Sequence, residues 1–451
     1  MSKKLTLFAL TWPIFIEIFL HMLMGNADTL MLSQYSDDAV AAVGVANQIL
    51  SVVIVMFGFV ATGAGILIAQ LLGAKKGKEA SEYVALALFI NFLFGLFISV
   101  VLFLFGESIL RMMKLPEELM DQSLQYLQIV GGLSFIESLI LTIGAIVRCH
   151  GFTKDAMYVT MGMNVLNVIG NYLFIFGPFG LPVLGVTGVA LSTAVSRAIG
   201  LVVMFMILWK RVEGQIPFQC LFPFPKKELG QLLKIGIPSA GEHLAYNSSQ
   251  VVITYFISLI GTESLTTKIY AQNISMFIFL FAVAMGQGTQ ILIGHLIGAR
   301  KNEEAYNTCL RSLRIAMLIS LGMASIFSLF REQLLGIFTD NPTVIALGST
   351  LILLTIILEP GRTFNLVIIN SLRSAGDVKF PVYMGILSMW GVGVTLSYLL
   401  GIHFGLGLIG VWIAFAADEW LRGLFMLWRW RSRVWEKMSF VNGKSQEGLG
   451  I

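Results

Sequence analysis

Charged residues are scarce in this chain of 451 residues. Lys, Arg, Asp and Glu together make up 12% of it, whereas a soluble domain carries about 25%. Apolar residues make up 56%. This balance excludes an ordinary soluble enzyme, a disordered chain and a coiled coil, and it leaves a polytopic membrane protein.

Cysteine and clustered histidine are scarce as well. Cys149, Cys220 and Cys309 are too few for a disulfide framework and do not have the spacing of a metal site. The five histidines are scattered, and no group of residues has the make-up of a catalytic centre. We therefore expect a protein that is not an enzyme and that needs no cofactor.

Long apolar segments, by contrast, are abundant in this sequence. A helix needs about 20 mainly apolar residues to cross a membrane. Twelve segments meet this requirement: 8–33, 41–71, 84–106, 122–147, 156–177, 185–209, 231–260, 267–297, 309–330, 343–371, 381–402 and 408–429. The first segment is too long for a signal peptide and contains Glu17 and Asp28, so we predict a spanning helix there too. The predicted fold is an all-α polytopic membrane protein with twelve transmembrane helices.

Basic residues are distributed unevenly between the two sides of these spans. The span bounds are approximate to a few residues. If the N-terminus is cytoplasmic, 23 of the 30 Lys and Arg residues lie in inside segments or at the span ends beside them, four in or beside outside loops, and three deep within spans. This asymmetry predicts a multi-pass protein of the inner (plasma) membrane with both termini cytoplasmic. The net charge of +4 then reflects topology, and we expect no nucleic-acid partner. The basic stretch from Arg429 to Lys437, with three tryptophans, is predicted to be an interfacial anchor.

The chain contains an internal repeat at an offset of 225 residues. Segment Ile68–Ala80 realigns with Ile293–Ala305. The same offset matches several further pairs: Pro13 and Pro238, Glu17 and Glu242, Arg148 and Arg373, Gly151 and Gly376. We predict two six-helix lobes, 1–209 and 231–432, joined by a cytoplasmic linker, 210–230, and followed by a tail, 433–451. An even number of spans in each lobe makes the repeats parallel, which suits alternating access.

Short motifs in a fixed order add a family resemblance. They are Trp12-Pro13, Asp28-Thr29, Leu72-Gly73-Ala74-Lys75, Arg148-Cys149-His150-Gly151, Asn167 and Asn171 before Phe174–Gly177, Gly185–Gly188, and Leu372–Asp377. Over nearly the whole chain their order and duplication resemble the bacterial multidrug and toxic compound extrusion (MATE) transporters. The resemblance implies twelve helices in two lobes and cation-coupled export of organic compounds.

Asp28 is the most informative ionisable residue within the spans. A charge at mid-membrane costs about 2.5–3.5 kcal/mol on the insertion scale, so such residues suggest function. Asp28 lies 11 residues after Glu17 on one helix face, with His21 on the same side, and its repeat counterpart is Ile253. A lone carboxylate in one lobe predicts a cation-coupling site that exchanges a proton or ligates Na⁺. The alternative is a carboxylate satisfied by nearby hydroxyl or backbone groups.

The family resemblance implies partners for Asp28. In the branch that this chain matches better than NorM, an asparagine and an aspartate in span five and a threonine in span six complete a cation site. Carried over, these become Asn167, Asn171 and Thr193. Asn171 departs from the pattern, which has a carboxylate there, so we favour H⁺ over Na⁺ at Asp28. For the asparagines, the alternative role is hydrogen bonding between helices.

Six residues are candidates for the substrate cavity: Glu17, His21, Glu242, Tyr246, Glu359 and Arg362. Glu17 and Glu242 each follow a proline by one turn, which suggests either hinges lining an inner cavity or a shared structural role. Tyr246 occupies the position that we align with a functional glutamate of the NorM branch. Glu359 either pairs with Arg362 on its own helix or faces the cavity and attracts a cation.

The function predicted is a secondary active antiporter, monomeric in the membrane lipid, that exports organic cationic amphiphiles in exchange for H⁺ or Na⁺. The 21 methionines and 33 phenylalanines suit an adaptable apolar cavity. The main alternative is a flippase for lipid-linked precursors, which needs a cationic cavity for a pyrophosphate. Away from the ends of the spans there are seven acidic residues against three basic ones, which disfavours it. A channel or receptor is a further alternative.

Overall fold

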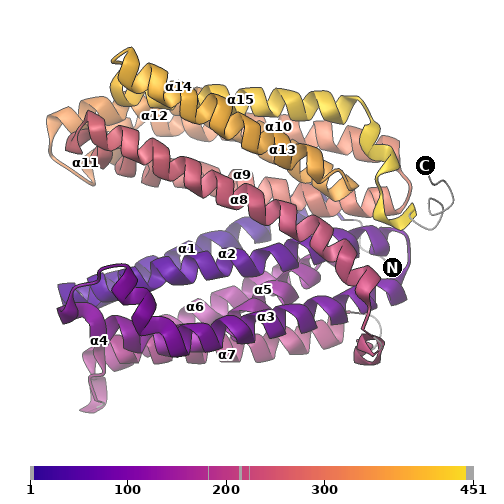
Figure 1. Cartoon of the computed structure of the whole chain (residues 1–451), viewed down its shortest axis with the longest axis horizontal. Helices are drawn as coiled ribbons and strands as arrows, with labels where there is room; N and C mark the ends of the chain where they lie inside the picture. The colour runs from indigo at the N-terminus through magenta and orange to yellow at the C-terminus, as the bar shows by residue number, and fades with distance from the viewer. Residues whose placement is uncertain (1–4, 181, 213–215, 223, 443–451) are drawn as a thin grey trace. The chain divides into compact units, whose positions relative to one another are not determined.

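A computed structural model describes residues 5–180, 182–212, 216–222 and 224–442. Within these ranges the chain is built from helices and turns, without strands. The first half contains the following helices: α1 (Leu7–Ser33), α2 (Asp37–Gly73), α3 (Gly77–Met112), α4 (Glu117–Tyr126), the π-helix η1 (Leu127–Gly131), α5 (Ser134–Cys149), α6 (Thr153–Phe176) and α7 (Gly185–Arg211). Figure 1 shows them as long, roughly aligned rods.

The second half repeats this series. Its helices are α8 (Lys226–Ile260), α9 (Thr262–Gly298), α10 (Asn302–Leu329), α11 (Arg331–Gly336), α12 (Pro342–Ala375), α13 (Lys379–Ser388), η4 (Met389–Val394), α14 (Thr395–Tyr398), η5 (Leu399–His403), α15 (Gly407–Arg431) and the 3₁₀ turn η6 (Val434–Lys437). Segments α13 to η5 form one continuous span, 379–403, in which η4 and η5 are π-helical.

All twelve predicted segments are helical, but fewer meet the requirements of a simple span. In the described part of the chain, nine helices are long and apolar enough, and the pair α4–η1 and α5, bent by 45°, makes a tenth. The two remaining segments are α8 and α15. Polar side chains such as Asn247 and Gln250 lower the hydropathy of α8, and α15 contains Asp418, Glu419 and Arg422. The sequence prediction counted these helices as ordinary spans because it weighed length above polarity.

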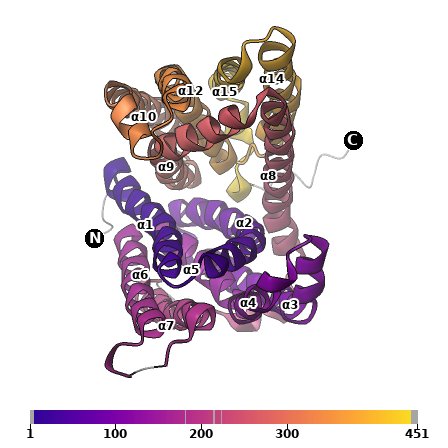
Figure 2. The ribbon, with the colours of Figure 1, turned by 90° about the vertical axis from the view of Figure 1, so that its left-hand side faces the viewer.

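The chain packs as two compact units. One comprises 16–68 and 76–236, and the other comprises 1–15, 69–75 and 237–451. In the first unit, helix α6 packs against α7 (Figure 2), and α3 packs against α5. Its core gathers residues such as Leu32, Phe57 and Tyr126. The division into lobes 1–209 and 231–432 stays a prediction, and residues 213–215, 223 and 443–451 of the predicted linker and tail lie outside the described residues.

In the second unit, α12 packs against α9, α10 and α15. Two tryptophans of the predicted interfacial anchor belong to its core. Trp430 and Trp435 are fully buried and stack with their ring centroids 4.2 Å apart, and the Trp435 indole N–H donates to the Trp430 carbonyl at 2.8 Å. Trp428 alone of the three is exposed, at 62%. The anchor prediction is therefore wrong for Trp430 and Trp435, because this tail folds back onto α10 and α12.

The repeat is visible in backbone conformation. Lys75 and Arg300 lie two residues beyond the ends of the equivalent helices α2 and α9, and each has a φ of 59°. Gly151 and Gly376 occupy equivalent turns with φ values of 84° and 103°, in the left-handed region that glycine adopts without steric cost. At Gly376 a Cβ would also overlap the backbone of Met438. The duplicated glycine is therefore required by the geometry of this turn.

Candidate functional site

Asp28 lies late in α1 with 4% of its surface exposed. The Asn171 side-chain amide of α6 donates a hydrogen bond to Asp28 Oδ1 at 2.5 Å. Asn167, one turn earlier on α6, accepts from the same amide at 3.4 Å. The fourth predicted residue joins through Asn167, whose Nδ2 donates to Thr193 Oγ1 of α7 at 3.1 Å. The structure therefore brings Asp28, Asn167, Asn171 and Thr193 into one hydrogen-bonded chain, which we call the Asp28 cluster.

Helix geometry explains why these residues meet. Asn167 and Asn171 are four residues apart, so both side chains lie on the same face of α6. The Ser192 hydroxyl of α7 donates to the Asn167 carbonyl at 2.8 Å and holds α6 against α7. At Gly170 a Cβ would overlap the Ser192 side chain, so a glycine permits this close crossing. All four members of the cluster are at most 4% exposed.

A second layer surrounds the cluster and was not predicted to belong to it. Tyr126, which is 2% exposed, faces Thr193, Asn47 and the Asp28 carboxylate. Arg197 of α7, one turn after Thr193, acts on Asp28 electrostatically and pairs with Glu137 of α5 at 3.3 Å. The i,i+4 spacing of Thr193 and Arg197 was a signal that could have placed this guanidinium near Asp28, but the sequence analysis did not use it. Glu137 thus partly neutralises the positive charge nearest the site.

The oxygen atoms of the cluster set its chemistry. Asp28 supplies a single carboxylate, while Asn167, Asn171 and Thr193 supply neutral oxygens. Asn171 Oδ1 is buried and accepts no hydrogen bond from any other described residue. A buried acceptor without a donor is costly, by about 1–3 kcal/mol, unless a further group reaches it. The arrangement can therefore accept a proton on Asp28, with Asn171 as its partner, or can surround a small cation with oxygens.

Glu17 and His21 do not belong to the Asp28 cluster. Glu17 is 7% exposed, and its Oε1 accepts from Arg148 Nη1 of α5 at 2.6 Å. His21, one turn further along α1, is half-buried. The equivalent pair in the other unit, Glu242 of α8 and Arg373 of α12, forms the same ion pair. Sequence reasoning matched the glutamates and the arginines separately, but it did not see that each glutamate contacts the arginine 131 residues later.

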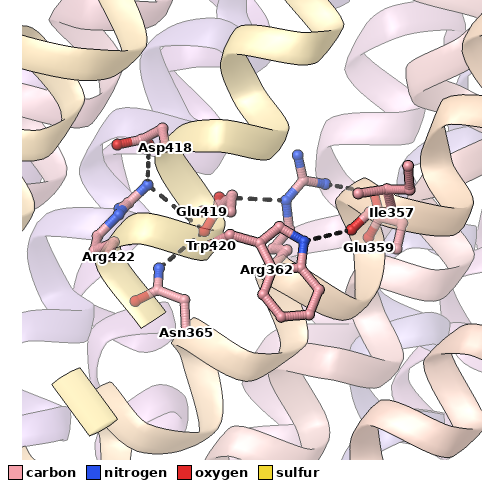
Figure 3. Close-up of polar contacts among 8 residues, drawn as sticks. All are labelled: Ile357, Glu359, Arg362, Asn365, Asp418, Glu419, Trp420 and Arg422. Carbon is pink, nitrogen blue, oxygen red and sulfur yellow. Dashed lines mark hydrogen bonds and ion pairs between the residues drawn. The ribbon is translucent and has the colours of Figure 1, made fainter. Parts of the chain in front are cut away.

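The remaining candidates lie in a polar network between α12 and α15 (Figure 3). Glu359, with none of its surface exposed, pairs with Arg362 at 2.8 Å, and Arg362 reaches Glu419 at 3.5 Å. Arg422 pairs with Asp418 and lies 3.6 Å from Glu419. The Asn365 amide donates to Glu419 at 2.9 Å. Glu359 is therefore paired on its own helix.

Tyr246 and Arg362 line a small cavity beside this network, with a volume of about 30 Å³. Gln250 of α8 and Gln272 of α9 contribute further polar walls. A cavity of this size holds about one water-sized ligand. The network counts three carboxylates against two guanidiniums, so it carries one negative charge in excess when all of them are ionised.

Both halves of the chain match one family. The profile of the MatE family matches residues 13–173 and again 238–399. An uncharacterized transporter of Bacillus subtilis (strain 168), YisQ, is 55% identical over 434 residues, which cover 96% of this chain and 95% of the relative. A probable multidrug resistance protein NorM of Thermotoga maritima is 27% identical over 444 residues, covering 98% and 96%.

Solved structures share the fold. A MATE protein in a bent conformation matches with a TM-score of 0.85 and 21% identity, covering 95% of this chain and 94% of that one. A MOP superfamily transporter from Pyrococcus furiosus, described as having a binding pocket of reverse polarity, matches with a TM-score of 0.84 and 20% identity, covering 95% of each chain. At these identities the likeness concerns the fold alone.

Proposed function

Because this chain belongs to the MATE family of transporters, we propose that it is a secondary active antiporter that exports organic cationic and amphiphilic compounds in exchange for H⁺ or Na⁺. The chain is a multi-pass membrane protein and not an enzyme. Relatives described as multidrug resistance proteins support export of this class of compound. The parallel repeat suits alternating access, in which one lobe moves against the other.

The proposed topology has twelve spans, including the polar helices α8 and α15. Charged residues in a span are tolerated where they pair with one another, and those of α15 pair with Arg362 and among themselves. The distribution of basic residues supports cytoplasmic termini, and we place the protein as a monomer in the inner (plasma) membrane.

The observation that carries the proposal is the hydrogen-bonded chain from Asp28 through Asn171 and Asn167 to Thr193. It connects α1, α6 and α7, so a change in the charge of Asp28 alters the contacts of three helices at once. The ionised carboxylate accepts from the Asn171 amide nitrogen. The protonated carboxyl can instead donate to the Asn171 oxygen, to which no other residue in the described part of the chain donates. A ligand drives transport only by binding the two conformations unequally, and this difference in hydrogen bonding supplies such a bias.

We assign the chain to the MATE branch with a cation site in the N-terminal lobe and propose H⁺ as the coupling ion. A sodium site gains from two carboxylates, and Asn171 supplies an amide where that branch has the second one. Asp28 is then the single proton-exchanging group of the cluster. Na⁺ coordinated by Asp28 and the three neutral side chains is the alternative.

A flippase for pyrophosphate-linked precursors is disfavoured by the pairing of the basic residues. Arg197, Arg362 and Arg422 lie deep within the predicted spans, and each contacts at least one carboxylate. These three charges are therefore offset, and the ion pairs support export of a cation over binding of a pyrophosphate.

Ethidium efflux from preloaded, pump-deficient cells tests the proposal. We expect the wild type to export the dye and Asp28→Asn to export none at equal membrane levels. Asp38→Asn is the matched control because Asp38 is an exposed carboxylate at the start of α2. Efflux that persists in Asp28→Asn refutes coupling at Asp28. Broad cation export is refuted if wild-type cells retain as much dye as cells without the protein.

A further inference from the structure

A long groove runs between α6 and α7, outside the Asp28 cluster. Its volume is about 740 Å³, within the range of about 300–1,000 Å³ that ligand pockets occupy. Most of its wall is apolar and is formed by residues such as Val159, Met163 and Val203. Its polar residues are concentrated at one end: Asp155, Tyr158, Lys210 and Arg211.

The length of the groove matches one leaflet of a bilayer. Its α7 wall extends from Ile199 to Arg211, a rise of about 18 Å at 1.5 Å per residue. Half of the hydrocarbon core measures about 15 Å. The polar end contains the start of α6 and the end of α7, which the positive-inside pattern places on the cytoplasmic side. The groove therefore extends from the cytoplasmic interface to about mid-membrane.

The charge at the polar end selects the ligand. Arg211 is engaged: it pairs with Asp155 at 2.8 Å and lies over the Phe152 ring at 4.7 Å. Lys210 is exposed and makes no ion pair within the ranges that the structure describes. The mouth thus carries a net positive charge and an available ammonium, which disfavours a cationic substrate and favours a phosphate.

We propose that this groove binds an anionic phospholipid of the cytoplasmic leaflet, with its phosphate at Lys210 and an acyl chain along the apolar wall. The proposal rests on the orientation given above but not on coupling at Asp28. Bound lipid covers the apolar wall between α6 and α7, the two helices that carry Asn167, Asn171 and Thr193.

Gly162 offers a way to fill the groove. It lines the groove, and a Cβ built there meets nothing within 4 Å, so Gly162→Leu starts a larger side chain from open space. Gly322→Leu is the matched control, because Gly322 is also an exposed glycine within a helix, α10, and its Cβ also meets open space. Lys210→Gln removes the ammonium and keeps a polar, hydrogen-bonding side chain.

The test reconstitutes the full-length protein in bilayers that contain phosphatidylglycerol or phosphatidylcholine, each with the same diazirine-labelled acyl chain. Peptide mass spectrometry then locates the crosslinks. We expect phosphatidylglycerol to label 153–211 about five-fold more than phosphatidylcholine, the effect of one basic residue at the membrane surface. Lys210→Gln should remove this preference, Gly162→Leu should abolish labelling by both lipids, and Gly322→Leu should change neither. Equal labelling by the two lipids in the wild type, or unchanged labelling in Gly162→Leu, overturns the proposal.

Discussion

The ion pair between Glu17 and Arg148 allows a quantitative test of the repeat. Their side chains are only 9% and 18% exposed, and the contact of 2.6 Å is direct, so both charges are largely desolvated. Removing one partner of a buried pair costs about 3–5 kcal/mol because the other charge is left uncompensated, whereas replacing both by apolar residues costs much less. We therefore expect Glu17→Met and Arg148→Met each to destabilise the protein by about 3–5 kcal/mol, and the double variant to be more stable than either.

Unfolding by sodium dodecyl sulfate in mixed micelles, followed by circular dichroism, measures the three stabilities. The coupling energy of the double-mutant cycle should exceed about 2 kcal/mol. Glu242→Met and Arg373→Met should give a similar value, because the repeat places the same ion pair in the other unit. The exposed pair Lys301–Glu304, at 53% and 59%, is the control and should give less than about 1 kcal/mol. Costs that simply add in both cycles would contradict the desolvated-pair reasoning.

Three further predictions follow from packing and from the cluster. Trp435→Ala should lower the free energy of unfolding by about 3–5 kcal/mol in the same assay, while the exposed Trp428→Ala should cost less than a third of that; equal costs would contradict the burial of Trp435. Gly73→Val should abolish folded expression, because its Cβ would overlap the His295 backbone, whereas Gly77→Ala has open space; normal yield of the valine variant would refute the close contact. Asn171→Asp supplies a second carboxylate and should make ethidium efflux more dependent on external Na⁺; an unchanged sodium response would argue against a ligand role for this side chain.

Much of the fold followed from hydropathy and the repeat, because apolar helices in a membrane satisfy their own backbone hydrogen bonds. Hydropathy was a poor guide to helices whose polar side chains form ion pairs or hydrogen bonds with one another. Helix α15 keeps Asp418, Glu419 and Arg422 within its length because they pair. The buried Trp430 and Trp435 were misplaced for a related reason: a basic segment with tryptophans looks interfacial until a stacking partner is known.

The candidate site was also predictable from the sequence only in part. Asp28 was identifiable as a carboxylate without a counterpart in the other half, and the structure brings the three implied partners to it. The ion pairs of Glu17 and Glu242 needed contacts between helices distant in sequence, which periodicity on a single helix does not reveal. The duplicated spacing between each glutamate and its arginine was a usable signal, since two pairs conserved by an internal repeat suggest a contact repeated in each half.

The central claim is that protonation of Asp28 couples the proton gradient to export. Its most direct test is ethidium transport by purified protein in proteoliposomes, with and without an imposed pH gradient at zero sodium. The account predicts that the gradient accelerates wild-type transport and the Asp38→Asn control, and that it has no effect on Asp28→Asn. A variant that still responds to the gradient as the wild type does would contradict the claim.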